Sequence, residues 1–306
     1  MKIGTIDIGT NSMRLLVANY NDGKLENRKK HINTTRIGQG VDQDGYIKED
    51  AMRRNLEALE KFAKICKDEE CVSVYCMGTS ALRDSKNGNE FVEQAKNRTG
   101  IDVDIISGKE ESNLGFRGVL EGLEANNSIL VIDIGGGSTE FIVGDREGIK
   151  FSKSENVGAL RMTEKFLKQD PIKEIEFENM SKFIYDEIKE TLDYIKSMNI
   201  EKIVGIGGTI TSLSAMNQKL EVYSMKKIHN SEVTVEEIEE ILQNLKQMTL
   251  NDKKTIKGLQ AKRADIIIAG VEILKIIIEN LEIKKIIVSE YDNLEGLMCQ
   301  KAQKMS

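Results

Sequence analysis

The sequence has few of the side chains from which proteins build zinc centres. It contains two histidines, His31 and His229, and four cysteines, none of them in a CxxC pair. Structural zinc sites need closely spaced pairs of ligands, so this pattern argues against one. We therefore expect free and mostly buried thiols, as in a cytoplasmic protein. Because Met1 leads directly into a predicted strand, no signal peptide is expected either.

An excess of positive charge and a long apolar run are also absent. The 44 Lys and Arg residues are outnumbered by 50 Asp and Glu residues, which gives a formal net charge of −6. Non-specific nucleic-acid binding relies on basic surfaces, so nucleic acid is not an expected partner. A polyanionic substrate would need a local basic cleft or metal ions. The most apolar stretch is interrupted by Glu272 and Lys275 and is too short to span a bilayer, so no membrane partner is expected.

A motif that occurs twice is the most informative feature present. It reads IDIGTNS from Ile6 and IDIGGGST from Ile132, and each copy is followed by an apolar run and a polar turn. Each copy predicts a strand, a turn of small residues, a second strand and a hairpin turn. The Asp of the motif is a hard carboxylate ligand, and the turn can bring N–H groups and hydroxyls close to an anion. Two such units predict two facing lobes with an anion site between them.

Strand and helix patterns alternate in both halves of the chain. Three strands are predicted at 2–8, 13–20 and 25–37, and three more at 129–134, 140–144 and 149–154. Helical spacing of apolar residues follows each group, which indicates mixed α/β lobes. With 306 residues the chain is long enough for two domains. We expect lobes at 1–124 and 125–306, joined in the linker-like Ala125–Ser128, with the last helix packing on the first lobe. Other expected features are a helix start at Pro171 and one helix over 261–281.

Six motifs occur in a characteristic order: DIGTNS, ISGKEES, VIDIGGGSTEF, GIGGT, KRADIIIAG and SEY followed by EGL. Together they resemble the exopolyphosphatase and guanosine pentaphosphate phosphohydrolase family over nearly the whole chain. The resemblance implies two ribonuclease-H-like lobes of the actin-like ATPase and sugar-kinase superfamily, with an interlobe cleft. It also implies a hydrolase that removes terminal phosphates from inorganic polyphosphate. Guanosine pentaphosphate (pppGpp) is the alternative substrate, and a non-catalytic polyphosphate or nucleotide sensor is the alternative outside enzymes.

The resemblance assigns the general base to Glu111, the second Glu of ISGKEES. On a helix Glu111 shares a face with Gly115, Gly118 and Gly122. Such a bare face suits close approach of a substrate or of the other lobe, but it also suits tight packing against another helix. The residues alone leave these interpretations open. Glu110 is expected to cap the helix, as the Glu of a capping box that begins at a serine.

The resemblance also implies a Mg²⁺ site, with Mn²⁺ as the alternative ion, held by Asp133 and Glu140. Asp7 is the equivalent carboxylate of the first copy and is expected to face the same cation, or otherwise to cap its turn. Arg83 is expected to clamp a phosphate. Arg14 and Arg263 also fall in family motifs, with ion pairs as the alternative. The turns expected to cradle phosphate comprise Thr10, Asn11 and Ser12, then Gly135, Gly136, Gly137 and Ser138, and finally Gly207, Gly208 and Thr209 at a helix N-terminus.

The last motif departs from the family pattern. It commonly reads SEYGLREGL but here reads SEYDNLEGL, so that Leu294 stands where an arginine is common. Any contact of that arginine with phosphate is therefore absent or replaced. Longer relatives carry further C-terminal helical domains after this motif, where the present sequence soon ends. We therefore expect a preference for short polyphosphate, unless a homodimer provides a longer basic track.

Overall fold

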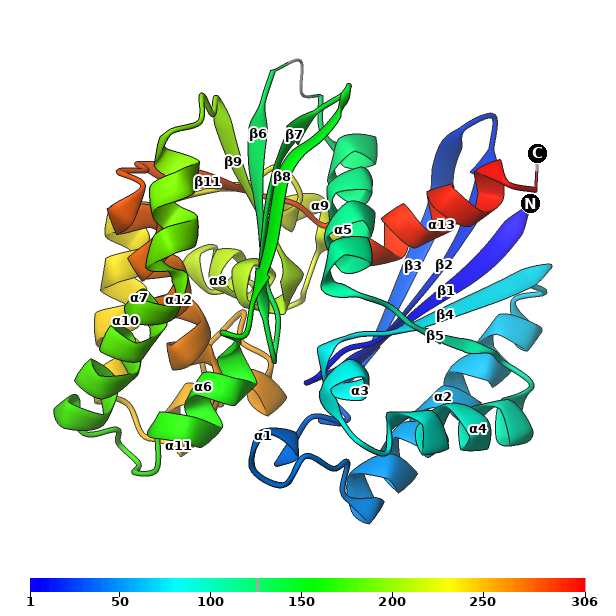
Figure 1. Ribbon diagram of the computed structural model, residues 1–306, viewed down its shortest axis with the longest axis horizontal. Helices are drawn as coiled ribbons and strands as arrows, with labels where there is room; N and C mark the ends of the chain where they lie inside the picture. Colours follow the sequence, from blue (N-terminus) through cyan, green and yellow to red (C-terminus); the bar gives the residue numbers. More distant parts are fainter. Residues whose placement is uncertain (125–126, 306) are drawn as a thin grey trace. The chain divides into compact units, whose positions relative to one another are not determined.

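The computed structural model describes residues 1–124 and 127–305 and divides into two units, which are treated separately (Figure 1). Unit 1 comprises Met1–Glu121 and the segment from Tyr291 onward, and unit 2 comprises Gly122–Glu290. The first boundary thus lies before the expected one at residue 125, and the last helix belongs to unit 1. Of the expected linker, Ala125 and Asn126 lie outside the described residues.

Unit 1 is built on a mixed five-stranded sheet of order β3-β2-β1-β4-β5. Strands β1, β2 and β3 form an antiparallel meander, whereas β4 and β5 run parallel to β1. The expected strand over 25–37 was too long, because the chain leaves the sheet after Asn33 and turns at Arg36, where φ is 50°. The strands are β1 (Lys2–Ile8), β2 (Met13–Asn21), β3 (Lys24–Asn33), β4 (Ser73–Gly78) and β5 (Val103–Ile105).

Helices cover both faces of this sheet. One face of α2 buries Leu56, Leu59 and Phe62 against the strand residues Ile6 and Ile8. Alternate strand residues point to the other face, where Ile3 and Leu16 pack against Leu294 and Met298 of α13. Asp7 and Arg14 have the same strand parity as Ile3 and Leu16, so they lie on the face that α13 covers. The helices are α1 (Val41–Asp44), α2 (Glu49–Asp68), α3 (Ser80–Asp84), α4 (Gly88–Thr99), α5 (Gly108–Gly122) and α13 (Asn293–Gln303).

Unit 2 repeats this sheet and adds an edge strand, giving the order β10-β11-β9-β6-β7-β8. Strands β6, β7 and β8 form the antiparallel meander, β9 and β11 continue in parallel, and β10 is antiparallel at the edge. Both units thus share the ribonuclease-H-like strand order, which confirms the expected α/β class. The strands are β6 (Ile129–Ile134), β7 (Thr139–Asp145), β8 (Gly148–Glu155), β9 (Lys202–Ile206), β10 (Glu232–Thr234) and β11 (Lys285–Val288).

The helices of unit 2 depart from expectation at two points. The expected helix over 261–281 is interrupted, because a short 3₁₀ helix ends at Arg263 and α12 begins only at Ile267. Pro171 precedes the first turn of α7, whose N-cap is Lys173. The helices are α6 (Ala159–Phe166), α7 (Glu174–Lys196), α8 (Gly207–Asn217), α9 (Met225–Ile228), α10 (Val235–Gln247), α11 (Leu250–Lys253) and α12 (Ile267–Asn280).

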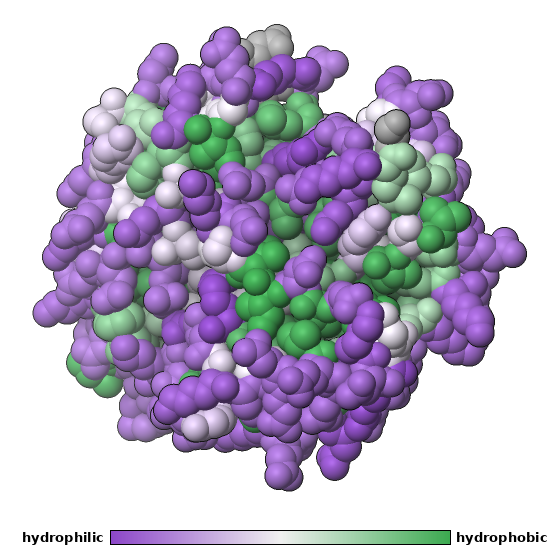
Figure 2. All heavy atoms as spheres, turned by 45° about the vertical axis from the view of Figure 1, so that its right-hand side comes forward, coloured by the Kyte–Doolittle hydropathy of each residue, from purple (hydrophilic) through white to green (hydrophobic). Residues whose placement is uncertain are grey.

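The apolar helix α12 packs inside unit 2, against α6, α7 and α10. Its residues Ile273 and Ile277 belong to the same buried cluster as Ile184 and Leu242. Within the described ranges, no helix combines the length and the apolar character that a membrane crossing requires. Hydrophilic residues cover most of the face drawn in Figure 2.

Candidate active site

The two copies of the repeated motif form the same closed turn at the end of a central strand. In unit 1 the N–H of Gly9 donates to the carbonyl oxygen of Ser12 at 3.1 Å, and in unit 2 the N–H of Gly135 donates to that of Ser138 at 3.0 Å. A Cβ atom at either glycine would lie 3.1 Å from that carbonyl oxygen, which leaves little room for a side chain. The duplicated strand–turn–strand expected from the sequence is therefore present in both units.

In each turn, carbonyl groups accept hydrogen bonds from N–H groups of another segment of the same unit. In unit 1 the carbonyl of Thr10 accepts from the N–H of Gly38 at 3.0 Å. In unit 2 the carbonyls of Gly135 and Gly136 accept from the N–H groups of Ala159 and Leu160, both at 2.9 Å. Because the N–H and C=O of a trans peptide point in opposite directions, tying down the carbonyls turns the N–H groups to the other side. The N–H groups of the turns are therefore candidate donors for an anion.

Arginine 161 was not recognised as part of this arrangement from the sequence. Its Nε donates to the carbonyl oxygen of Gly137 at 2.6 Å, one residue further along the same turn. Gly158 also lies so close that a Cβ there would be 2.5 Å from the carbonyl carbon of Gly137. No sequence motif predicts the contact of these two residues with the turn, because it depends on where α6 packs.

The two copies differ in the residue that faces the aspartate across the hairpin. Asp133 of β6 is in register with Glu140 of β7, whereas Asp7 of β1 is in register with Arg14 of β2. The second copy therefore places two acidic residues side by side, and the first copy places an acid beside a base. Of the two, the second copy has the charge that favours a divalent cation.

The acidic pair of unit 2 is buried and its geometry is fixed. Oε1 of Glu140 accepts hydrogen bonds from the hydroxyls of Ser138 and Ser154, both at 2.7 Å. Oδ1 of Asp133 lies against Gly207. The φ of Gly207 is 85°, and a Cβ on this residue would collide with the Asp133 carboxylate. Among the described residues, no three His, Cys, Asp or Glu side chains cluster as a complete metal site. Mg²⁺ needs no such cage, because it commonly takes one or two carboxylates together with water and phosphate oxygens. The donor set thus fits Mg²⁺.

Asp7 of unit 1 is only half satisfied. Its Oδ2 accepts from Nε of Arg14 at 3.1 Å and from Nη2 of Arg14 at 2.5 Å. Its Oδ1 is buried without a hydrogen-bond partner. Burial raises the pKa of the Asp7 carboxyl, although Arg14 opposes this effect. A buried carboxylate oxygen without a donor is costly, and a cation would satisfy it.

The rest of the first turn connects to the helix that carries Arg83. The Thr10 hydroxyl is 2.6 Å from that of Ser80, the first residue of α3. Asn11 donates through Nδ2 to the hydroxyl of Ser12 at 3.1 Å, and its buried Oδ1 has no hydrogen-bond partner. Unit 1 therefore brings the turn residues and α3 together at the carboxyl ends of β1 and β4.

Glu111 lies in the first turn of α5, largely buried, and Arg83 contacts it. Nη1 of Arg83 is 3.3 Å from Oε2 of Glu111 and donates to the carbonyl of Ile106 at 2.9 Å. The neighbouring Glu110 is exposed and completes the expected capping box, because its Oε2 accepts from the N–H and the hydroxyl of Ser107, both at 2.8 Å. Arg83 thus holds the expected base, in addition to being a candidate for phosphate binding.

The glycine face of α5 is explained in part by helix packing. A Cβ at Gly118 would collide with the backbone carbonyl of Asp292, and one at Gly296 would collide with that of Leu114. These glycines let α5 and α13 approach closely within unit 1. Of the interpretations left open by the sequence, tight packing therefore accounts for Gly118. Leu294 is buried in the apolar cluster under α13, so the position where an arginine is common points into the core here.

The third turn begins α8, and the guanidinium group of Arg263 lies against it. A Cβ at Gly208 would overlap the guanidinium of Arg263, which therefore lies directly on this helix N-terminus. The side chain of Thr209 is buried, and a Cβ at Gly270 of α12 would be 2.6 Å from its hydroxyl. Thr209 can therefore contribute its backbone N–H to an anion. Arg263, for which the sequence left an ion pair as the alternative role, adds positive charge at this helix N-terminus.

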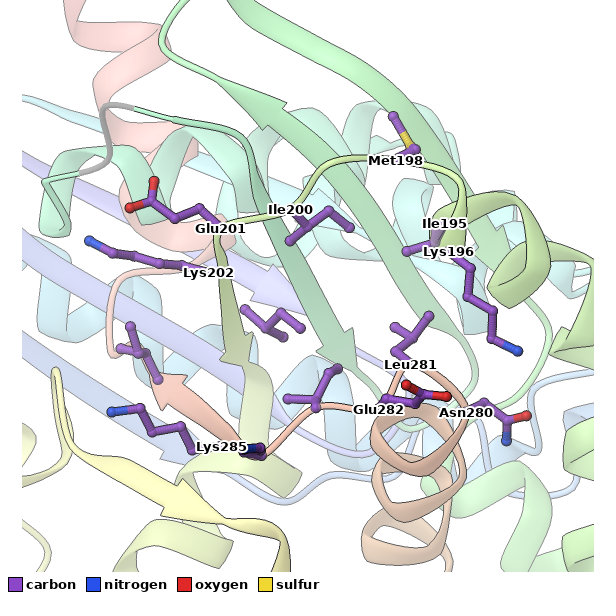
Figure 3. A pocket seen from close by; sticks show the side chains of 14 residues that line it. Ile195, Lys196, Met198, Ile200, Glu201, Lys202, Asn280, Leu281, Glu282 and Lys285 are labelled. Carbon is purple, nitrogen blue, oxygen red and sulfur yellow. The ribbon is translucent and has the colours of Figure 1, made fainter.

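One cavity of unit 2 lies away from these residues. It has a volume of about 600 Å³ and is lined by Ile200, Lys202, Leu281 and Lys285 among others (Figure 3). Lys202 and Lys285 begin the parallel strands β9 and β11, whereas Gly207 follows the end of β9. The cavity is therefore at the opposite edge of the sheet from the third turn, and we do not assign the chemistry to it.

Known proteins with similar sequences include several phosphatases. The chain is 38% identical to a bifunctional 3-dehydroquinate synthase/phosphatase of Fusobacterium nucleatum, over 97% of this chain but only 46% of that protein. It is 31% identical to exopolyphosphatase 2 of Mycobacterium tuberculosis, over 97% of both. It is 27% identical to a guanosine-5'-triphosphate,3'-diphosphate pyrophosphatase of Vibrio cholerae, over 98% of this chain and 59% of that protein. The chain thus spans about half the length of some of these relatives.

Solved structures and a family model give the same assignment. An exopolyphosphatase from Cytophaga hutchinsonii is 27% identical, with a TM-score of 0.92 over 99% of this chain and 98% of that one. A Ppx/GppA family member from Aquifex aeolicus is 29% identical, with a TM-score of 0.82 over 100% and 99%. The model of the Ppx/GppA phosphatase family matches residues 16–305, which is nearly the whole chain. The chain therefore belongs to the Ppx/GppA phosphatase family.

Proposed function

We propose that this protein hydrolyses the terminal phosphoanhydride bond of inorganic polyphosphate, with Mg²⁺ as its cofactor. The observation that carries the proposal is the duplicated turn, whose carbonyls are tied down and whose strand ends in a buried aspartate in each unit. Backbone donors beside carboxylates suit a phosphate that is bound together with a cation. The exopolyphosphatases among the relatives support this choice of substrate.

We further propose a role for each group of candidate site residues. Glu111 accepts a proton from the attacking water, whose oxygen forms a bond to the terminal phosphorus while the bond to the rest of the polyphosphate breaks. The turn N–H groups hold the phosphate oxygens, and Arg83 keeps the Glu111 carboxylate in place and binds phosphate. When bound, Mg²⁺ would supply charge neutralisation, with Asp133 and Glu140 as its ligands in unit 2 and Asp7 as the candidate ligand in unit 1. Positioning and electrostatics account for most catalysis of phosphoryl transfer.

A second substrate follows from the relatives. The Vibrio cholerae protein is named for its action on guanosine-5'-triphosphate,3'-diphosphate, and the same catalytic residues could remove the terminal phosphate of that nucleotide. A non-catalytic sensor is disfavoured because Glu111, Asp133 and Glu140 are all present and buried. A cytoplasmic location, for which the free cysteines are suited, and a homodimer both stay predictions.

The test is a panel of substrates under one condition. The purified protein with Mg²⁺ is given short polyphosphate, long polyphosphate, pppGpp or ATP, and released phosphate is measured. We expect release from polyphosphate at a higher kcat/KM than from pppGpp or ATP. Release from pppGpp alone would replace the proposed substrate by the second one. Binding of polyphosphate without any release would favour the sensor.

A further inference from the structure

A buried row of alternating charges lies between the meander of unit 1 and the N-terminus of α13. Asp7 contacts Arg14, and Nη1 of Arg14 donates in turn to Oδ2 of Asp292 at 2.7 Å. Asp292 immediately precedes α13, and its side chain is only 7% exposed. A single arginine thus joins the first-copy aspartate to the cap of the last helix.

The two oxygens of Asp292 have different partners. Oδ1 accepts from the N–H of Leu294 at 3.0 Å and so caps α13, whereas Oδ2 receives Arg14 and, at 3.4 Å, Nζ of Lys30. Burial opposes ionisation of this carboxyl, but Arg14 and Lys30 outweigh it and hold the pKa of Asp292 below its usual range. Asp292 is therefore a charged group with a fixed orientation.

Glu295 and two basic side chains of β3 make further contacts around Asp292. Oε1 of Glu295 lies 3.1 Å from both Nζ of Lys30 and Nη2 of Arg28. Oε2 of Glu295 accepts from the N–H of Asp292 at 3.0 Å, which completes the capping box. The guanidinium of Arg28 lies 3.7 Å from the ring centre of Tyr291. These contacts leave the start of α13 little freedom to move on the sheet.

The backbone of Asp292 also touches the helix of the proposed base. A Cβ at Gly118 of α5 would collide with the carbonyl group of Asp292. Asp292 therefore contacts α5, which carries Glu111, through its backbone, and contacts Asp7, through Arg14, with its side chain.

We propose that Asp292 is a positioning residue for Asp7, an inference that rests on the proposed function. By holding Arg14 against Oδ2 of Asp7, it leaves the unpartnered Oδ1 as the oxygen that would contact a cation. It also balances the charge of Arg14, which would otherwise repel a cation bound by Asp7. Both effects favour Mg²⁺ binding, so removing the Asp292 charge weakens it.

Asp292→Asn is the direct test, because asparagine still caps a helix but carries no charge. Calorimetric titration of the substrate-free protein with Mg²⁺ gives the dissociation constant without any turnover. Loss of an outer partner of a metal ligand commonly weakens metal binding about tenfold or more, and we expect a change of that size. Asp252→Asn removes the same charge from an exposed capping box in unit 2 and is expected to leave the dissociation constant unchanged.

A double-mutant cycle shows whether Asp292 acts through Arg14. In an Arg14→Gln background, Asp292→Asn is expected to change the Mg²⁺ dissociation constant by less than about twofold, since the mediating group is gone. An equal loss in both backgrounds would overturn the inference, as would wild-type Mg²⁺ affinity in Asp292→Asn with only a lowered Tm. If the wild type itself binds no Mg²⁺, the proposed cofactor is wrong and this inference fails with it.

Discussion

At the scale of single residues, the acidic pair of unit 2 carries the metal hypothesis. Asp133→Asn and Glu140→Gln each replace a charged ligand by a neutral one of the same shape. Each is expected to raise the Mg²⁺ concentration for half-maximal phosphate release by about tenfold or more, in line with lost metal contacts elsewhere. Ser152→Ala, two residues before Ser154 on β8, is the control. Unchanged Mg²⁺ dependence in both variants would remove the pair from the metal site.

Glu272 is a buried acid that the proposed chemistry does not use. It lies in α12 with one carboxylate oxygen unpartnered, and burial raises the pKa of its carboxyl. Because the folded pKa lies above the unfolded value, its contribution to stability is complete below the unfolded pKa and is lost as pH rises through the folded pKa. Glu272→Gln is therefore expected to gain stability relative to the wild type as pH rises from about 4 towards neutrality.

Urea denaturation of both proteins at a series of pH values measures this effect. The difference between their free energies of unfolding isolates Glu272, because other titrating groups contribute equally to both. A difference that is constant with pH, or that changes in the opposite direction, would contradict the burial argument.

At the scale of elements, the close crossing of α5 and α13 depends on Gly118. Gly118→Ala places a Cβ against the backbone of Asp292, which cannot swing away as a side chain would. We expect a loss of about 1–3 kcal/mol in stability, typical of an overpacked site. Asn113→Ala, at an exposed position of the same helix, should be neutral or slightly stabilising. Equal urea midpoints for Gly118→Ala and the wild type would show that the helices can separate without cost.

The elements also show what the sequence could predict. The repeated Asp-Ile-Gly turns and their flanking strands were predictable, because short apolar runs bounded by turns of small residues are local signals. The pairing of Asp7 with Arg14 was not, since strand register decides it. The break between Arg263 and Ile267, and the edge strand β10, depend on tertiary packing that no local pattern reports. The close contact of Gly118 with the backbone of Asp292 also depends on tertiary packing, so the sequence left the role of this glycine open.

At the scale of the whole molecule, the chain consists of two units with the same strand order but different charges at equivalent positions. Glu140 in unit 2 corresponds to Arg14 in unit 1, each in register with its Asp. We infer that the repeat has specialised, with the cation held mainly by unit 2 and the base supplied by unit 1. Asp7→Asn should then weaken Mg²⁺ binding less than Asp133→Asn, a comparison that calorimetric titration makes directly. The opposite order would contradict this division of roles.

The most direct measurement of the central claim is phosphate release from polyphosphate in water enriched in ¹⁸O, with the wild type and Glu111→Gln compared by mass spectrometry. Glutamine keeps the shape of the side chain but cannot accept a proton from water at neutral pH. Because water attacks the terminal phosphorus, the released phosphate carries one solvent oxygen, which makes the hydrolysis product measurable in each protein. If Glu111 activates the attacking water, Glu111→Gln releases this phosphate at least about 100-fold more slowly, as expected for loss of a general base. Release by Glu111→Gln at a rate close to that of the wild type would contradict the account.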